Sequence, residues 1–202
     1  MEESGEGRQA KAEASEASRE DCELMVRVQG RDEAALGALM ARWERPVKSL
    51  VGRIVFNAGE AEELAQETFV RVWQQREKFR AGAAFRPWVF SIAVNLARNR
   101  LRWWRSRPTV SLQEGSETEV GGGRQEAGGS IAMERGERAS AVRDAVAALP
   151  LELREAIVLF EFEQMSHAEI AATLGCTAKA VETRIYRARE KLRAALGRWL
   201  RD

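Results

Sequence analysis

A glycine-rich stretch near the middle of the chain constrains the fold more than any other feature of the sequence. Residues 108–138 are rich in Gly, Ser and Glu and contain two glycine runs, at 121–123 and 128–129. A segment of this composition cannot bury enough apolar surface to offset the entropy that ordering would cost. We therefore predict a flexible linker over 108–138 that joins two separately folded domains, 21–107 and 139–202.

Both predicted domains have the apolar periodicity of helices. Apolar residues recur at spacings of three or four, as from Met25 to Val28 and from Leu36 to Leu39, which is typical of amphipathic helices. Asp32, after a break at 30–31, is a predicted N-cap. Neither domain has the sustained alternation typical of strands. We predict an all-α fold, with the acidic residues 1–20 as a disordered tail.

Composition narrows the class of protein. No apolar run approaches the roughly 20 residues that a membrane-spanning helix needs, and the N-terminus lacks the apolar core of a secretory signal. The two cysteines, Cys22 and Cys176, lie far apart, and His167 is the only histidine. No disulfide framework, metal site, catalytic group or cofactor is therefore expected. These features predict a cytoplasmic protein with no membrane partner.

The distribution of charge indicates nucleic acid as a partner, although the net charge is only +1. Local fields decide such binding, because salt screens charges within about 10 Å. Basic residues gather in two stretches, and two phosphate-contacting surfaces are expected from them. The first stretch holds Arg98, Arg100, Arg102, Arg105 and Arg107, and the second holds Arg184, Arg187, Arg189, Lys191, Arg193, Arg198 and Arg201.

The segment 166–192, which overlaps the second basic stretch, has the sequence signature of a helix-turn-helix. Ser166 and Glu169 have the spacing of a capping box at a helix start. Gly175 then suits a tight turn, and Thr177 is a predicted cap for the next helix. That helix has an apolar stripe and a polar remainder able to enter a major groove. On spacing alone, two amphipathic helices packed on a bundle are the alternative.

Two sets of motifs resemble the extracytoplasmic-function sigma factors of the sigma-70 family. SHAEIAATLGCTAKAVETRIYRAREKL, over 166–192, and the preceding ALPxxxREA, over 148–156, resemble the fourth region of that family. EELAQETFVRVW, over 62–73, and FRAGAAFRPWVFSIAVNLARNRL, over 79–101, resemble its second region. The resemblance implies a factor that binds core RNA polymerase and directs it to promoters, with region 2 at the −10 box and region 4 at the −35 box.

The resemblance also implies roles for individual residues. Docking on the β′ clamp helices of core polymerase would use Glu63, Gln66, Glu67 and Phe69. Contacts to the opened −10 box would use Phe79, Arg80, Asn95, Arg98 and Arg102. Contacts to the −35 box would use Lys179, Glu182, Thr183, Arg184, Tyr186 and Arg187. Further partners implied are the β flap of polymerase, promoter DNA and an anti-sigma factor.

Several of these positions keep more than one interpretation. Trp88 is favoured as a core residue over a stacking platform, and Asn95 is open to a base contact or to a capping or buried hydrogen bond. The pair Trp103 and Trp104 is favoured as a hydrophobic patch over a stacking surface. Position 182 is commonly basic in the family, whereas this chain has Glu182. We expect that carboxylate to shift the preferred upstream sequence, because it can accept from a cytosine amino group.

Two other functions compete with a sigma factor. A conventional helix-turn-helix regulator would need no polymerase, but it would leave the motif over 79–101 unexplained. An enzyme is disfavoured, because His167 belongs to the predicted capping box and neither cysteine has a partner base. The regulon, the inducing signal and the role of Cys176 are not indicated by the sequence.

Overall fold

The computed structural model describes residues 6–80, 82–106, 129–197 and 199, and the regular elements within these residues are all helices. The all-α prediction is therefore confirmed. In chain order the elements are α1 (Glu6–Gln29), α2 (Glu33–Val55), α3 (Ala58–Gln74), η1 (Arg76–Lys78), α4 (Phe85–Ser106), α5 (Gly129–Ala147), α6 (Leu151–Ile157), the π-helical turn η2 (Val158–Phe162), α7 (His167–Leu174) and α8 (Ala178–Leu196).

The first domain is built by α1 to α4 around an apolar core. The predicted N-cap is confirmed: Asp32 accepts from the Ala35 backbone N–H at 3.0 Å and starts α2. Asn57 caps α3 in the same way, accepting from Glu60 N–H at 3.0 Å. The buried faces of α2, α3 and α4 then meet in one core, whose large members include Leu50, Phe85 and Phe90.

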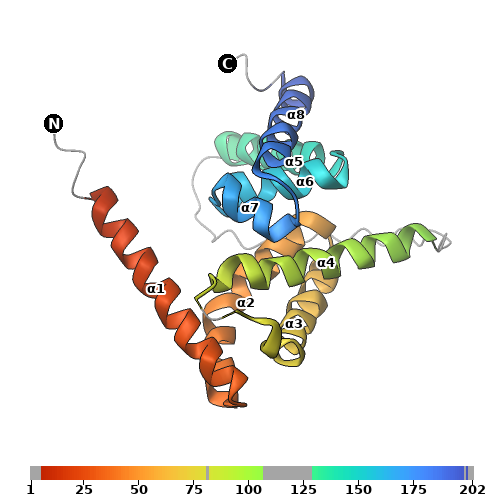
Figure 1. The fold of residues 1–202 in the computed structure, drawn as a ribbon. Coiled ribbons are helices and arrows are strands. Elements are labelled where there is room, and N and C mark those ends of the chain that lie inside the picture. Colours follow the sequence, from red (N-terminus) through yellow and green to blue (C-terminus); the bar gives the residue numbers. More distant parts are fainter. Residues whose placement is uncertain (1–5, 81, 107–128, 198, 200–202) are drawn as a thin grey trace.

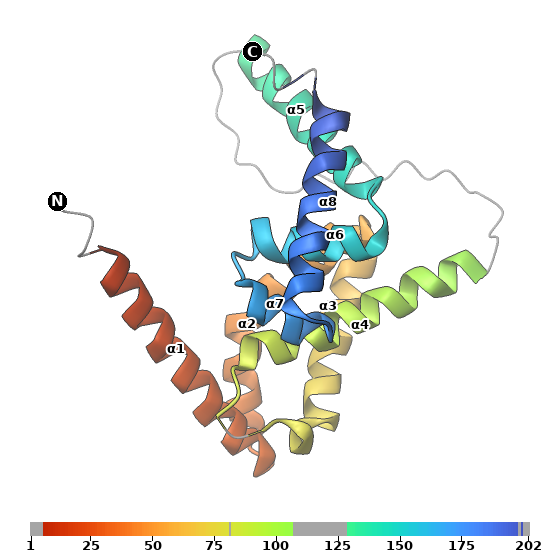
Figure 2. The same ribbon diagram turned by 45° about the horizontal axis from the view of Figure 1, so that its top comes forward.

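The acidic N-terminal segment differs from the sequence prediction. A disordered tail was predicted over 1–20, but α1 already begins at Glu6 and extends away from the other helices (Figures 1 and 2). Its docked end explains how the helix is held, because Asp21 is buried and accepts from Arg42 at 2.7 Å and from Trp43 Nε1 at 3.0 Å. Residues 1–5 lie outside the described part of the chain.

The second domain is built by α5 to α8. The predicted linker was too long at its C-terminal end, because α5 begins at Gly129 rather than after 138. Residues 108–128, the remainder of that prediction, lie outside the described part. Pro150 separates α5 from α6, and the buried side chains of α6, η2, α7 and α8 form the core, with Ile157, Leu159 and Ile170 among its largest members.

The two domains pack against each other. Helix α7 lies across α4 (Figures 1 and 2). The turn η2 and helix α6 contact α2. Polar contacts cross this interface: Arg98 binds Glu155, and Arg154 donates to the Ile54 carbonyl at 2.7 Å. None of the described helices is both long and apolar enough to span a bilayer.

Candidate nucleic-acid interface

The helix-turn-helix of the second domain is formed by α7, a tight turn and α8. The predicted capping box is present in full, because Ser166 Oγ accepts from Glu169 N–H while the Glu169 carboxylate accepts from Ser166 N–H at 2.9 Å. Gly175 takes the left-handed conformation at φ 66° that the turn requires. Thr177 caps α8 by accepting from Ala180 N–H at 3.2 Å. This geometry positions α8 with one face on the core and one face in solvent.

The solvent face of α8 carries five of the six residues predicted for the −35 box. The side chains of Lys179, Glu182, Thr183, Tyr186 and Arg187 are exposed, and their spacings place them on one stripe, which we call the α8 stripe. Lys179 donates to Glu182 at 2.9 Å, and this hydrogen bond, with the charge of Lys179, lowers the pKa of Glu182 below its ordinary value. The carboxylate is therefore ionised near neutral pH and can act as an acceptor.

Arg184, the sixth predicted residue, lies off this stripe. It is half-buried, forms an ion pair with Glu152 at 3.1 Å and donates to Cys176 Sγ at 3.7 Å. Arg184 also lines a cleft with Arg98 and Arg102 of the first domain, and it does not join the exposed surface. On α8, Arg184 lies between the buried side, which carries Val181 and Ile185, and the exposed side. This position explains why its side chain is only half-exposed.

Helix α4 brings together three of the residues predicted for the −10 box. Asn95, Arg98 and Arg102 follow one side of α4, which we call the α4 stripe, with Arg98 donating to Asn95 Oδ1 at 3.4 Å. Arg102 is exposed and donates to Asn99 Oδ1 at 3.1 Å, and Asn95 is exposed rather than buried. Arg80 is exposed in the loop before α4, so four polar candidates lie on the surface of the first domain or at its interface.

Phe79 was predicted as a stacking surface, and the structure places it in the core. Its exposed fraction is 3%, and its ring lies 5.2 Å from Trp88 and 6.2 Å from Phe85. Trp88 belongs to the same ring cluster and is half-buried, packed against the core rather than within it. Phe79 therefore supports the loop after η1 rather than offering a free ring face.

The polymerase-contact prediction also needs one correction. Glu63, Gln66 and Glu67 line the solvent side of α3, but Phe69 is buried at 2% exposure. The exposed apolar residue of that side is Val70, at 47%. The helical period of the sequence already places Val70 rather than Phe69 on the solvent side. Positions 63, 66, 67 and 70 share one face, whereas 64, 65, 68, 69 and 72 share the core face. We call Glu63, Gln66, Glu67 and Val70 the α3 stripe.

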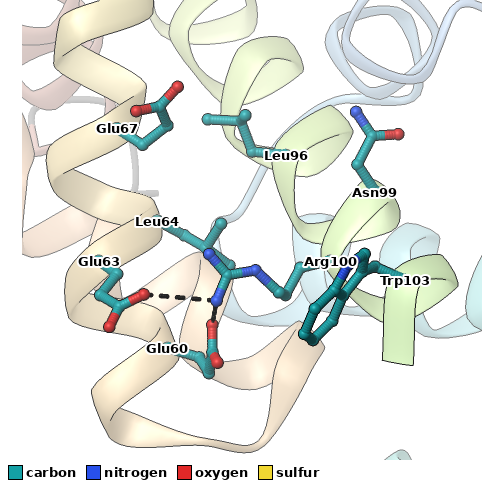
Figure 3. A pocket seen from close by; sticks show the side chains of 8 residues that line it. All are labelled: Glu60, Glu63, Leu64, Glu67, Leu96, Asn99, Arg100 and Trp103. Atoms are coloured by element: carbon teal, nitrogen blue, oxygen red, sulfur yellow. Dashed lines mark hydrogen bonds and ion pairs between the residues drawn. The ribbon is translucent and has the colours of Figure 1, made fainter. Parts of the chain in front are cut away.

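A cleft of about 660 Å³ separates the α3 stripe from the end of α4 (Figure 3). Three carboxylates from α3 face it, and Arg100 from α4 binds two of them, Glu60 and, at 3.4 Å, Glu63. Trp103, 47% exposed, borders the cleft on the α4 side. The cleft thus presents acidic groups beside an aromatic ring, a surface suited to basic side chains of a partner.

Comparison with known proteins follows the same division of the chain. The family described as Sigma-70 region 2 matches residues 39–107, and the family described as Sigma-70, region 4 matches residues 139–192. The RNA polymerase sigma-H factor of Pseudomonas aeruginosa is 34% identical over 187 residues, which cover 91% of this chain and 97% of that protein. The ECF RNA polymerase sigma-E factor of Escherichia coli is 36% identical over 177 residues, covering 84% and 90%.

Solved structures agree with this assignment. CnrH, in complex with the cytosolic domain of CnrY, is 29% identical and superposes with a TM-score of 0.67 over 88% of this chain and 97% of its own. The sigma factor RpoE of Bartonella quintana, in complex with the anti-sigma factor NepR, shares the fold at 23% identity, with a TM-score of 0.59 over 80% of this chain and 96% of its own. The chain therefore belongs to the extracytoplasmic-function sigma factors of the sigma-70 family and directs promoter-specific transcription initiation.

Proposed function

We propose that this sigma factor binds its partners through three surfaces. The α8 stripe binds the −35 box, and the α4 stripe with Arg80 binds the opened −10 strand. The α3 stripe docks on the β′ clamp helices of core polymerase. The domain limits that accompany these roles are 39–107 for polymerase binding and opening and 139–192 for the upstream box. The arrangement of α8 carries the proposal, because a capped, exposed and polar helix behind a tight turn is the geometry of major-groove recognition.

The α8 stripe supplies chemistry suited to base edges and phosphates. Arg187 can bind a guanine edge or a phosphate, Lys179 a phosphate, and Glu182 a cytosine amino group. Arg184 is left out of this surface, because its partners Glu152 and Cys176 hold it in the cleft between the domains. We assign Arg184 to positioning the turn before α8.

Run-off transcription with core polymerase tests the role of α8. Sequencing the transcripts induced by overexpression first supplies a promoter. Arg187→Ala should then lower transcription from it roughly 5- to 100-fold, as loss of one base or phosphate contact does. Arg189→Ala is the matched control, since Arg189 lies on the same helix but is neutralised by Glu161 at 2.7 Å. Equal losses in the two variants would contradict the assignment of the α8 stripe.

Substitutions at two exposed valines, one in the α3 stripe and one on α1, test the role of the α3 stripe. Val70→Asp should weaken binding to core polymerase, because it puts a charge into the only apolar part of the stripe. Val26→Asp is the control: Val26 lies on α1 and is similarly exposed, at 54% against 47%. Binding is measured by competition for labelled core polymerase. If Val26→Asp were as damaging as Val70→Asp, polymerase docking on α3 would be excluded.

We further propose that the protein acts in the cytoplasm without catalysing a reaction itself, and that an anti-sigma factor restrains it. Promoter opening then relies on the capture of unstacked bases, each of which costs only about a few kcal/mol to flip. Membership of the family supports this proposal, and the similar sigma factor RpoE was solved in complex with an anti-sigma factor. Transcription by core polymerase with this protein and no other added factor tests whether the promoter opens without an ATP-hydrolysing activator.

A further inference from the structure

We propose that the packing of the two domains is an autoinhibited resting state, in which Glu155 of the second domain occupies the arginine that the first domain uses for DNA. This inference rests on the proposed function of the α4 stripe and adds a regulation to it. Its central observation is one ion pair across the interface, between Arg98 on α4 and Glu155 on α6.

The Arg98–Glu155 pair has the geometry of a specific contact. The guanidinium donates through two nitrogens to the two carboxylate oxygens, each at 2.7 Å. Glu155 has no exposed surface, and the Arg98 side chain is only 25% exposed. Such a forked pair satisfies both charged groups at once, so the two nitrogens that bind Glu155 cannot bind a phosphate while the pair exists.

The neighbouring cleft brings a second residue of the α4 stripe, the exposed Arg102, close to the second domain. Arg98 and Arg102 line a space of about 330 Å³ whose opposite wall comes from α6, from the turn before α8 and from α8 itself. Glu152, Glu155 and Arg184 belong to that wall. A DNA strand lying along the α4 stripe would have to occupy the same place as the second domain.

Other contacts also hold the interface. Arg154 donates to the Ile54 carbonyl at 2.7 Å, and its guanidinium lies 5.3 Å from the Phe56 ring centre. Arg86 donates to the Glu163 carbonyl, and Thr173 donates to the Pro87 carbonyl at 3.4 Å. Because these bonds use backbone carbonyls of one domain and side chains of the other, they define one docked orientation rather than a loose encounter.

The interface also contains groups that lose water on closing. Burial raises the pKa of Glu163, opposed by the nearby charges of Arg86 and Arg53. Glu155 would regain water if the domains separated, so the closed state depends on Arg98 remaining its partner. A ligand that competes for Arg98, such as a phosphate of the promoter strand, therefore favours the open state.

The first experiment measures closure in the full chain. Glu155→Gln keeps the shape of the side chain but removes its charge, and it should increase the radius of gyration measured by small-angle scattering. Glu190→Gln is the control, because Glu190 is exposed on α8 and pairs with Arg193 inside its own domain. Arg86→Ala breaks the interface at a distant point and should give the same expansion as Glu155→Gln, which guards against a local folding defect in either variant.

The second experiment measures DNA access with a labelled single strand carrying the −10 sequence of a mapped promoter. Glu155→Gln and Arg86→Ala should each bind it at least about 5-fold more tightly than the wild type, the lower end of ordinary coupling between two sites. Glu190→Gln should bind it as the wild type does.

The outcomes separate the inference from the proposed function. An unchanged radius of gyration and unchanged strand affinity in both opening variants would overturn the closed state. Expansion without a gain in affinity would overturn the block. Arg98→Ala in the Glu155→Gln background should abolish the gain; if the gain persisted, the assignment of Arg98 to DNA would fail even though closure had been shown.

Discussion

Asp21 illustrates how one buried side chain holds a helix to the domain. Its carboxylate accepts from Arg42 and from Trp43 Nε1, and it has almost no exposed surface. Burial raises its pKa above the ordinary value, an effect that the charge of Arg42 and the two hydrogen bonds only partly oppose. The acceptor atoms are therefore more important for α1 than the negative charge.

This balance predicts different outcomes for two substitutions. Asp21→Asn keeps an acceptor for Trp43 and should lower the free energy of unfolding by less than about 1 kcal/mol, whereas Asp21→Ala leaves the indole N–H unsatisfied and should cost about 1–3 kcal/mol. Urea denaturation of the two variants measures the difference. Equal destabilisation would show that Trp43 does not depend on this acceptor.

The same residue gives a pH dependence with a defined sign. Because the folded-state pKa is raised, the stability that Asp21 contributes is complete below the unfolded value, about 3.8, and declines as pH rises through the folded pKa. Asp21→Asn does not titrate there. Relative to the wild type, it should therefore gain stability as pH rises from about 4 to 7, and urea curves at the two ends of that range measure the gain. A relative loss over that range would contradict the raised pKa.

Glu182 carries the prediction on promoter sequence. Its exposed carboxylate, ionised through its contact with Lys179, should favour a cytosine amino group and repel phosphates. Glu182→Lys should change the preferred base at one position of the −35 box while polymerase binding stays constant. Transcription from a set of promoter variants measures the preference, with Glu190→Lys, on the same helix beyond the stripe, as the control. An unaltered preference would remove Glu182 from base recognition.

At the scale of single residues, sequence reasoning found exposed polar groups better than it assigned aromatic ones. Lys179, Tyr186 and Arg187 were predicted on the α8 surface and lie there. Phe69 and Phe79 were predicted at binding surfaces and lie in the core. A phenylalanine buries more apolar area than most side chains, so the core takes it unless the helical period prevents that.

At the scale of elements, caps and turns were the most predictable features. The capping box at Ser166, the left-handed Gly175 and the cap at Thr177 all follow from local hydrogen bonding, which needs no distant partner. The extents of α1 and α5 were not predicted. Their polar composition resembles that of a linker, and docking such as that of Asp21 on Arg42 becomes visible only in the folded domain.

Replacing glycine with alanine at each of two positions tests the role of backbone conformation in these elements. Gly175→Ala should lower stability by about 1–2 kcal/mol, because the left-handed conformation at φ 66° is unfavourable with a Cβ, although space around it is open. Gly136→Ala, in α5 and equally open, should instead raise stability by about 0.5–1 kcal/mol. Thermal unfolding of both variants measures the two signs. A stabilising Gly175→Ala would mean that the turn changes conformation.

At the scale of the whole molecule, the sequence divided the chain correctly into two helical regions but did not reveal that they pack together. The predicted linker implied independent domains, and the motifs over 79–101 and 148–156 were each interpreted by themselves. Arg98 and Glu155 belong to different motifs and lie 57 positions apart. Each is expected to be solvated when its own helix is considered alone, so only their juxtaposition shows that one sequesters the other.

The burial of this interface predicts how the free protein responds to salt. Ions screen exposed charges strongly, but a pair whose carboxylate has no exposed surface is screened little. Binding of a DNA strand releases counterions and weakens steeply with salt. From about 0.05 to 0.5 M salt, the radius of gyration of the free protein should therefore stay constant while strand affinity falls several-fold or more. Expansion with rising salt would instead mean that long-range attraction between the domains, rather than the buried Arg98–Glu155 contact, keeps them closed.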